Sequence, residues 1–194
     1  MVHLNNKIDE VIVTTLSANG CAHSAPMGIT RSNGQVLIQP FKPSTTYDNL
    51  KAHRQCTINY TDDVRVFAGA VTGRRTWNTL PCQQIEGEYL EQALAHIELE
   101  LVIFDDSDPR ASFTGTIIKE VMHAPFRGFN RAQNAVIEAA VLTSRLNILP
   151  EDKIKQEISY LRLAIEKTGG DREREAWGWL MDKIEDYGIE LTHD

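Results

Sequence analysis

The chain has few cysteines, and the three that it has match no common framework. Cys21, Cys56 and Cys82 are odd in number and widely spaced along 194 residues, so they indicate neither a disulfide-stabilised fold nor a zinc site. Long apolar runs are missing too: no stretch approaches the roughly 20 residues that a membrane span needs, and no apolar signal region stands at the N-terminus. A cytoplasmic protein without membrane association is expected.

Positive charge is also scarce. Lys and Arg number 20 against 27 Asp and Glu, which gives a net charge of −7. A general nucleic-acid binder needs a basic surface to displace counterions, so no nucleic-acid partner is expected. The hydrophobic content of 42% and charged content of 24% are typical of a soluble globular protein.

Recognisable catalytic motifs are absent from the sequence. The six histidines are scattered and show no metal-pair spacing, and neither Gly-x-Ser-x-Gly nor Gly-x-Gly-x-x-Gly occurs. We therefore predict no metal site and assign no catalytic residue.

The first 61 residues indicate a β-rich segment. Runs rich in β-branched residues predict strands over 8–15, 22–30, 35–40 and 56–60. Asn19-Gly20 and Asn33-Gly34 lie between the first three strands, and Asn-Gly is a favoured hairpin turn. A short helix is expected over 44–53.

The middle of the chain continues the β pattern. A helix is expected over 62–71 with Asp62 as its cap, followed by a long loop over 73–94. In the strand expected over 96–104, Glu98 and Glu100 alternate with apolar residues, which predicts a half-exposed antiparallel strand. Residues 111–122 complete the strands.

From residue 130 onward the sequence becomes helical. Three helices are expected over about 130–147, 151–167 and 171–187, the first with an alanine-rich face for close packing and the third capped by Asp171. The chain is therefore an α+β protein. We predict a β-barrel domain over 1–125 and a helical C-terminal subdomain over 126–194.

A cation and a hydroxyl cluster stand at the start of the helix expected over 44–53. Lys42 is followed by Ser44, Thr45 and Thr46, which are good N-cap residues, and Asn49 lies one turn beyond Thr46. Free N–H groups and hydroxyls at a helix N-terminus suit a phosphate. The alternative is an ordinary helix cap.

Four pieces together give the chain a family likeness. They are a strand ending in Thr14-Thr15, a Gly turn, a strand containing Ala25-Pro26, and the Lys42 to Asn49 segment before a strand ending in Asn59. This order resembles the N-terminal part of the FMN-binding split barrel of flavin reductases. Phe129-Asn-Arg-Ala132 before an alanine-rich helix resembles one branch, found in archaea and methylotrophic bacteria and known only as a family of unknown function.

The resemblance implies a split barrel that dimerises, with an FMN between the two subunits. It implies that the segment Ser24, Ala25, Pro26, Met27, Gly28 and Ile29 lines the isoalloxazine or ribityl chain. It assigns the phosphate and inner ribityl hydroxyls to Lys42, Ser44, Thr45, Thr46 and Asn49. Flavin reductases often have Arg where this chain has Lys42, and Lys offers a point charge rather than a fork.

The segment between the last strand and the first C-terminal helix is a second candidate. Arg127 and Arg131 are cations near a helix N-terminus, where the macrodipole disfavours positive charge. An anion between them, or carboxylate partners elsewhere, would explain them. We include Asn130 and Arg131 among the candidate cofactor-binding residues.

Three functions stay open at this stage. The first is an FMN-dependent oxidoreductase acting on a small redox substrate, with a pterin of one-carbon metabolism suggested only by the family's occurrence. The second is an FMN-binding carrier or sensor without turnover, and the third is a split barrel that binds haem or another cofactor. The lack of a catalytic motif fits all three, because a bound flavin carries its own redox chemistry.

Overall fold

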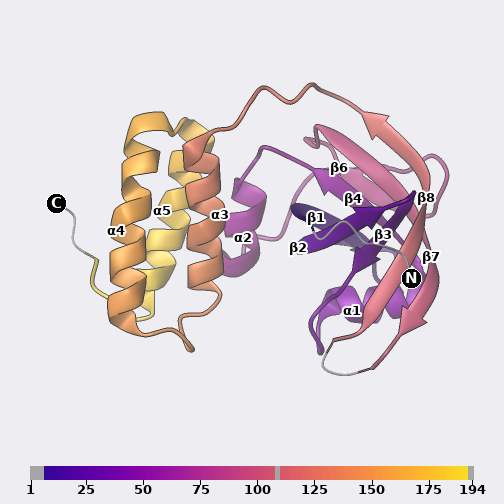
Figure 1. Cartoon of the computed structure of the whole chain (residues 1–194), viewed down its shortest axis with the longest axis horizontal. Helices are drawn as coiled ribbons and strands as arrows, with labels where there is room; N and C mark the ends of the chain where they lie inside the picture. Colours follow the sequence, from indigo (N-terminus) through magenta and orange to yellow (C-terminus); the bar gives the residue numbers. More distant parts are fainter. Residues whose placement is uncertain (1–6, 108–109, 192–194) are drawn as a thin grey trace. The chain divides into compact units, whose positions relative to one another are not determined.

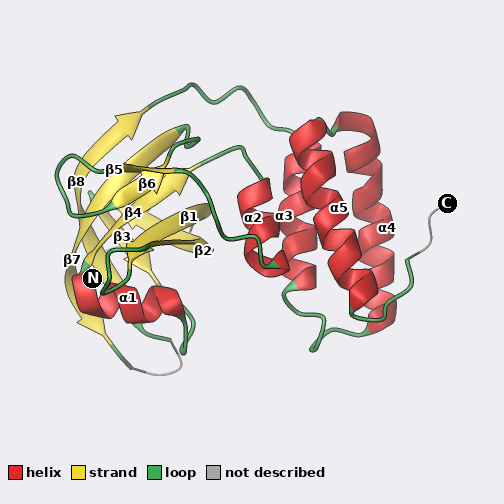
Figure 2. Cartoon of the chain, turned by 180° about the vertical axis from the view of Figure 1, so that it is seen from behind, coloured by secondary structure: helices red, strands yellow, loops and turns green. Residues whose placement is uncertain are grey.

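The computed structural model describes residues 7–107 and 110–191 and confirms an α+β chain. It contains two compact units (Figures 1 and 2). One unit consists of the chain up to Thr61 and of Thr76–Phe126. The other consists of Asp62–Arg75 and of the chain from Arg127 on.

The first unit is a closed antiparallel barrel of six strands, as the family resemblance implied. Around the barrel the order is β1-β2-β3-β8-β7-β4, so sequence neighbours form the β1–β2–β3 and β7–β8 hairpins. The strands are β1 (Ile8–Leu16), β2 (Ala22–Ser32), β3 (Gln35–Ile38), β4 (Gln55–Tyr60), β7 (Ala95–Asp105) and β8 (Ser112–Met122).

The hairpin turns follow from local residue chemistry. Asn33 and Gly34 between β2 and β3 have φ of 50° and 75°, the positive values that a type I′ turn requires. Alternate apolar side chains then point into the barrel, where they form a core that includes Val11, Val13, Ile29, Val36, Ile58, Ile97, Leu99 and Phe113.

Residues 73–94 correct the expectation of a plain loop. They contain a small antiparallel hairpin of β5 (Thr79–Pro81) and β6 (Glu88–Leu90). Each strand has three residues, and β5 ends in Pro81, so neither produces the longer run of β-branched residues that marks a strand in sequence.

The pattern in β7 also requires a correction. Glu100 is exposed as expected, but Glu98 has no solvent-exposed surface. Residues 83–85 lie over this part of the strand and their backbone N–H groups bond to the Glu98 carboxylate. A period-two pattern cannot reveal that a distant loop supplies donors for a glutamate.

Over its described residues, the second unit consists of four helices, and one of them comes from the middle of the chain. They are α2 (Arg65–Thr72), α3 (Arg131–Thr143), α4 (Glu151–Thr168) and α5 (Asp171–Asp186). Figure 1 shows α2, in purple, beside α3 in the helical unit. The sequence placed residues 62–71 among the barrel elements, because nothing local indicates which core an amphipathic helix joins.

The helix ends differ from the expected ones for local reasons. Asn130 caps α3 as predicted, but α5 begins at Asp171, and Glu173 accepts from the Gly170 N–H instead. For α2, Asp63 rather than Asp62 accepts the Arg65 N–H. Helix α3 ends at Thr143, where the hydroxyls of Thr143 and Ser144 bond back to carbonyls of its last turns.

The helical unit has its own hydrophobic core. The alanine face of α3 is buried as predicted and packs with α4 and α5 around residues that include Ala132, Ala135, Ala139, Ile154, Ile158, Leu161, Ala176, Leu180 and Ile184. Among the described residues, no helix is long and apolar enough to cross a membrane.

A hydroxyl-rich candidate site on the barrel unit

Helix α1 (Thr45–His53) presents its N-terminus as the sequence predicted. Ser44 is the cap, and its Oγ accepts the Tyr47 N–H at 3.2 Å. The N–H groups of Thr45 and Thr46 come before the first intrahelical bond, so they stay available as donors. Thr45 is exposed, whereas Thr46 and Asn49 lie together on the buried face of the helix.

Lys42 lies upstream of this helix and has an anionic partner within the chain. Its Nζ donates to the Asp106 carboxylate at 3.0 Å and to the Asp106 carbonyl at 3.1 Å. The same carboxylate accepts the Tyr47 hydroxyl and lies 3.6 Å from the Lys51 ammonium. Hydrogen bonds from Lys42 and then Tyr47 hold the pKa of Asp106 below its usual value, so the carboxylate is ionised.

A buried network of hydroxyl and amide groups connects α1 with β1, β2 and β4. Asn49 Nδ2 donates to Thr15 Oγ1 at 2.9 Å, and Asn59 Nδ2 donates to Thr14 Oγ1 at 3.1 Å. Thr14 Oγ1 in turn lies 2.8 Å from Ser24 Oγ. Two predicted site residues, Ser24 and Asn49, are therefore fixed by partners to which the sequence interpretation assigned no role.

The sequence already contained a pattern that pointed to these partners, Thr14, Thr15 and Asn59. Thr14-Thr15 and the strand-ending Asn59 belong to the motif that supported the family resemblance, but only their order along the chain was used. The structure shows their physical role, which is to satisfy buried polar groups and to orient the side chains beside them.

The first part of β2 has one hydrogen-bonded neighbour. Residues 22–30 pair with β1, whereas β3 pairs with β2 only from Ile29 onward. In the part of the chain that the structure describes, the Ser24–Gly28 stretch is therefore an open strand edge. Pro26, which has no N–H to donate, is accommodated at such an edge.

The neighbouring strand leaves no room for a side chain at Gly28. A Cβ at this position would lie 2.7 Å from Ile8 Cγ2 on the neighbouring strand. This tight contact with β1 by itself accounts for a glycine at position 28.

Asn130 and Arg131 lie in the helical unit. The Asn130 side chain is hydrogen-bonded within that unit, whereas Arg131 is exposed. Asn130 Oδ1 accepts the N–H groups of Ala132 and Gln133, and its Nδ2 donates to the Thr168 carbonyl. Its amide thus joins the start of α3 to the end of α4. Arg131, the first residue of α3, is exposed.

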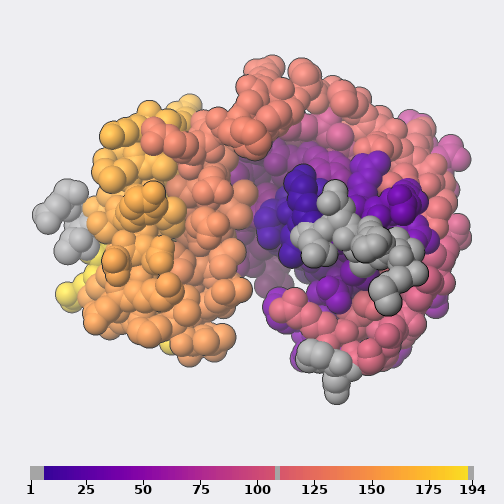
Figure 3. All heavy atoms as spheres, in the orientation of Figure 1, coloured from indigo at the N-terminus to yellow at the C-terminus, as the bar shows by residue number. Residues whose placement is uncertain are grey.

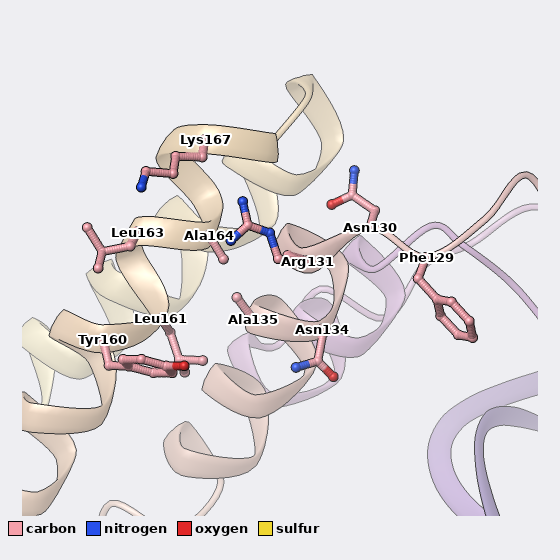
Figure 4. A pocket seen from close by; sticks show the side chains of 10 residues that line it. All are labelled: Phe129, Asn130, Arg131, Asn134, Ala135, Tyr160, Leu161, Leu163, Ala164 and Lys167. Carbon is pink, nitrogen blue, oxygen red and sulfur yellow. The ribbon is translucent and has the colours of Figure 1, made fainter.

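Arg131 lines a pocket of about 450 Å³ between α3 and α4. Figure 3 shows that these two helices supply most of the surface of the helical unit in that view, and Figure 4 shows the Arg131 side chain extending from α3 toward α4. Lys167 and Tyr160 of α4 line the same pocket. All the lining residues belong to the helical unit.

The closed barrel, the hydroxyl-rich start of α1 and the helical unit define a split-barrel protein with a helical C-terminal part. The chain belongs to the family described as "Protein of unknown function (DUF447)". The N-terminal domain of that family matches residues 9–124, and its second domain matches residues 130–182.

Relatives of known sequence or structure agree with this assignment. An uncharacterized protein of Methanocaldococcus jannaschii is 25% identical over 193 residues, which cover 90% of this chain and 96% of the relative. An FMN-bound protein of the same family from Methanosarcina mazei matches with a TM-score of 0.78 at 21% identity, over 93% of this chain and 96% of that one.

A more distant structure shares part of the fold. The 2-nitrobenzoate 2-nitroreductase of Pseudomonas fluorescens matches 62% of this chain and 67% of its own, with a TM-score of 0.51 at 18% identity.

Proposed function

We propose that this protein binds FMN on the barrel unit and acts as an FMN-dependent oxidoreductase on a small redox substrate. The observation that carries the proposal is the shared fold, over nearly the whole length, with an FMN-bound member of the same family. The candidate residues are those of α1, the segment before it, and the open edge of β2.

The donors at the start of α1 suit a phosphate dianion. A dianion is best held by a cation together with several N–H and O–H donors. The N-terminus of α1 offers two backbone N–H groups and the exposed Thr45 hydroxyl, and Lys42 provides the cation. Because Lys42 already contacts Asp106, its ammonium must be shared with that carboxylate or released from it when a phosphate binds.

The open edge of β2 suits the rest of the cofactor. Residues 24–28 are half-buried in the single chain and have no strand on one side among the described residues. A flat ring can lie against such an edge, and Ser24, whose hydroxyl lies 2.8 Å from that of Thr14, stands on it.

When bound, FMN would supply the electron-transfer chemistry, and the chain would bind and orient it. The residues at the start of α1 would then hold the phosphate, and the open edge of β2 would support the ring. No substrate-contacting residue is assigned, and a pterin-like substrate remains a proposal that turnover assays with reduced and oxidised pterins would test.

We also propose that the protein is a homodimer with FMN at the subunit interface. A second chain would cover the edge of β2 that the described residues of one subunit leave open, through a self-complementary contact. Light scattering at micromolar protein tests this. A mass near twice 21.9 kDa is expected, whereas a monomer with tightly bound flavin would contradict a shared site.

The cofactor is tested by purifying the full chain, recording its ultraviolet-visible spectrum and separating the released cofactor by chromatography. We expect two flavin bands and FMN rather than FAD, because one phosphate site and no dinucleotide fingerprint are present. A single intense haem band, or no cofactor even after reconstitution with FMN, would overturn the proposal.

Enzyme and carrier are then distinguished by turnover. The FMN-loaded protein should oxidise NADH or NADPH repeatedly in the presence of an electron acceptor. Reduction of the bound flavin without release of electrons to any acceptor tested would instead support a carrier or sensor.

A further inference from the structure

A buried carboxylate and two imidazoles form a connected group on the barrel unit, outside the candidate FMN site. His96 and Glu98 are two residues apart on β7, so their side chains point to the same face of the strand. Their exposed fractions are 2% and 0%. His123 follows the end of β8 and is exposed.

Glu98 is held as an anion. Its carboxylate accepts backbone N–H groups of Gln83 at 3.0 Å, Gln84 at 2.7 Å and Ile85 at 3.2 Å. Burial raises the pKa of Glu98, but the bonds from Gln83, Gln84 and His96 outweigh it and leave the pKa below the usual value. The carboxylate can therefore only accept hydrogen bonds.

This anion determines the hydrogen bonds of the imidazoles. His96 Nε2 lies 3.4 Å from Glu98 Oε1, so Nε2 must carry the proton. Burial lowers the pKa of His96, and its Nδ1 is then an acceptor. Because Nδ1 lies 2.8 Å from His123 Nε2, His123 must be the donor, which leaves its own Nδ1 as the basic nitrogen.

Aromatic packing holds the two imidazoles in place. Their planes are nearly parallel, at 12°, and the Tyr89 ring stacks on both at 6°, with centroids 3.9 Å from His96 and 5.0 Å from His123. Tyr89 belongs to β6, so the hairpin that was missing from the sequence prediction completes the group.

We propose that His123 is a general acid–base group whose Nδ1 exchanges a proton with a small molecule bearing an acidic O–H or N–H group. His96 and Glu98 are positioning residues: Glu98 sets the tautomer of His96, and His96 orients the His123 ring. This arrangement follows the logic of carboxylate–histidine pairs that activate a third group. It does not depend on FMN binding.

The proton transfer balances without any electron transfer. The O–H or N–H bond of the small molecule breaks, its electron pair stays on that molecule as an anion, and a new N–H bond forms at His123 Nδ1. The resulting imidazolium is stabilised by the hydrogen bond from His123 Nε2–H to His96 Nδ1. The negative charge of Glu98, which accepts from His96 Nε2–H, adds to this stabilisation. The reverse transfer makes His123 the acid.

Other charged groups act on this trio. Burial is the largest effect on the pKa of His96 and lowers it, Glu98 raises it, and the charges of His123 and of Lys119 on β8 lower it further. The Cys82 thiol, whose pKa burial raises to about 12 with Glu98 and Glu88 adding to the rise, stays neutral. Glu98 is therefore the anion in direct contact with His96, and it should control how readily the pair takes up a proton.

The test is a pH titration of the ¹⁵N-histidine-labelled full chain by NMR. At high pH we expect the Nε2–H tautomer for His96. In Glu98→Gln the pH midpoint at which the histidine pair takes up its first proton should fall by about one unit or more relative to the wild-type chain, the size of shift that a nearby opposite charge causes.

Two further variants keep the test decisive. In His96→Asn, the titration midpoint of His123 should differ from that in the wild-type chain, and this comparison remains available if Glu98→Gln proves unstable. Glu120→Gln, which removes an exposed carboxylate of β8 bonded to Arg31, should leave both histidines unchanged, and His53 serves as an internal reference. Independent titration of His96 and His123, unaffected by loss of either partner, would show a packing cluster and overturn the proposal.

Discussion

Lys42 is the residue on which the proposed phosphate site depends most, and it is also the one whose charge is already partnered. Its ammonium shares the Asp106 carboxylate with Lys51, which lies in the last turn of α1. The two lysines thus have the same anionic neighbour but stand at opposite ends of the helix. This makes Lys51 a matched control.

Removing Lys42 should therefore weaken FMN binding far more than removing Lys51. A hydrogen bond to a charged group contributes about 1.5–3 kcal/mol, so Lys42→Ala should raise the Kd for FMN roughly tenfold to a hundredfold. Lys51→Ala removes only exposed contacts and should change the Kd less than about fivefold. Fluorescence titration of FMN measures both. Equal effects of the two substitutions would place the phosphate elsewhere.

Glu98 predicts how acid affects the stability of the barrel unit. Its pKa in the folded protein lies below the usual 4.5, so its contribution is present above that pH and is lost as the pH falls through the folded pKa. Glu98→Gln should lower the free energy of unfolding by about 1.5–3 kcal/mol at neutral pH. The difference from wild type should shrink below pH 4.5.

Urea unfolding followed by circular dichroism at several pH values measures this difference. Glu120→Gln, at an exposed ion pair, is the control and should change stability by less than about 1 kcal/mol. A gap between wild type and Glu98→Gln that stays constant down to pH 3 would contradict an ionised, stabilising carboxylate.

Individual residues were predictable where the chemistry is local. The Asn130 cap and the Asn33-Gly34 turn follow from side-chain and backbone preferences of a few adjacent positions. The burial of Glu98 was not predictable, because its donors come from a loop more than ten residues away. The bond from Asn49 to Thr15 likewise joins residues 34 apart.

At the scale of elements, α2 shows what a sequence pattern leaves open. Its amphipathic spacing predicted a helix, and the structure has one, but its partners are α3 and α5 rather than the barrel strands beside it in the sequence. A buried carboxylate just before the helix explains how it begins. Asp63, 1% exposed, accepts the Arg65 N–H at 3.2 Å and forms an ion pair with the Arg65 guanidinium at 2.6 Å.

Asp63→Ala should destabilise the helical unit. It removes the acceptor at the start of α2 and the short ion pair with Arg65. The free energy of unfolding should fall by about 2–3 kcal/mol. This is less than for a fully buried ion pair, because Arg65 is partly exposed. Asp62→Ala, at the position that the sequence suggested as the cap, should cost less than about 0.5 kcal/mol. Denaturant unfolding followed by helix signal compares them. Similar losses for both would contradict this assignment.

At the scale of the whole molecule, the fold class was accessible from sequence because the strand and helix periodicities are strong. The order of the barrel strands was not, since β1 pairs with β4 and β3 with β8 across long sequence separations. The family resemblance supplied what periodicity could not. The candidate FMN site is in turn built from separate elements, α1, β1, β2 and β4, that the barrel brings together.

The central claim is that the barrel unit recognises FMN through its phosphate. Titration of the cofactor-free full chain with FMN and, separately, with riboflavin tests it most directly, because the two ligands differ only in that phosphate. Several charge-assisted hydrogen bonds to the phosphate should make FMN bind at least about tenfold more tightly than riboflavin. Equal affinity for the two ligands, or no binding of either, would contradict the account.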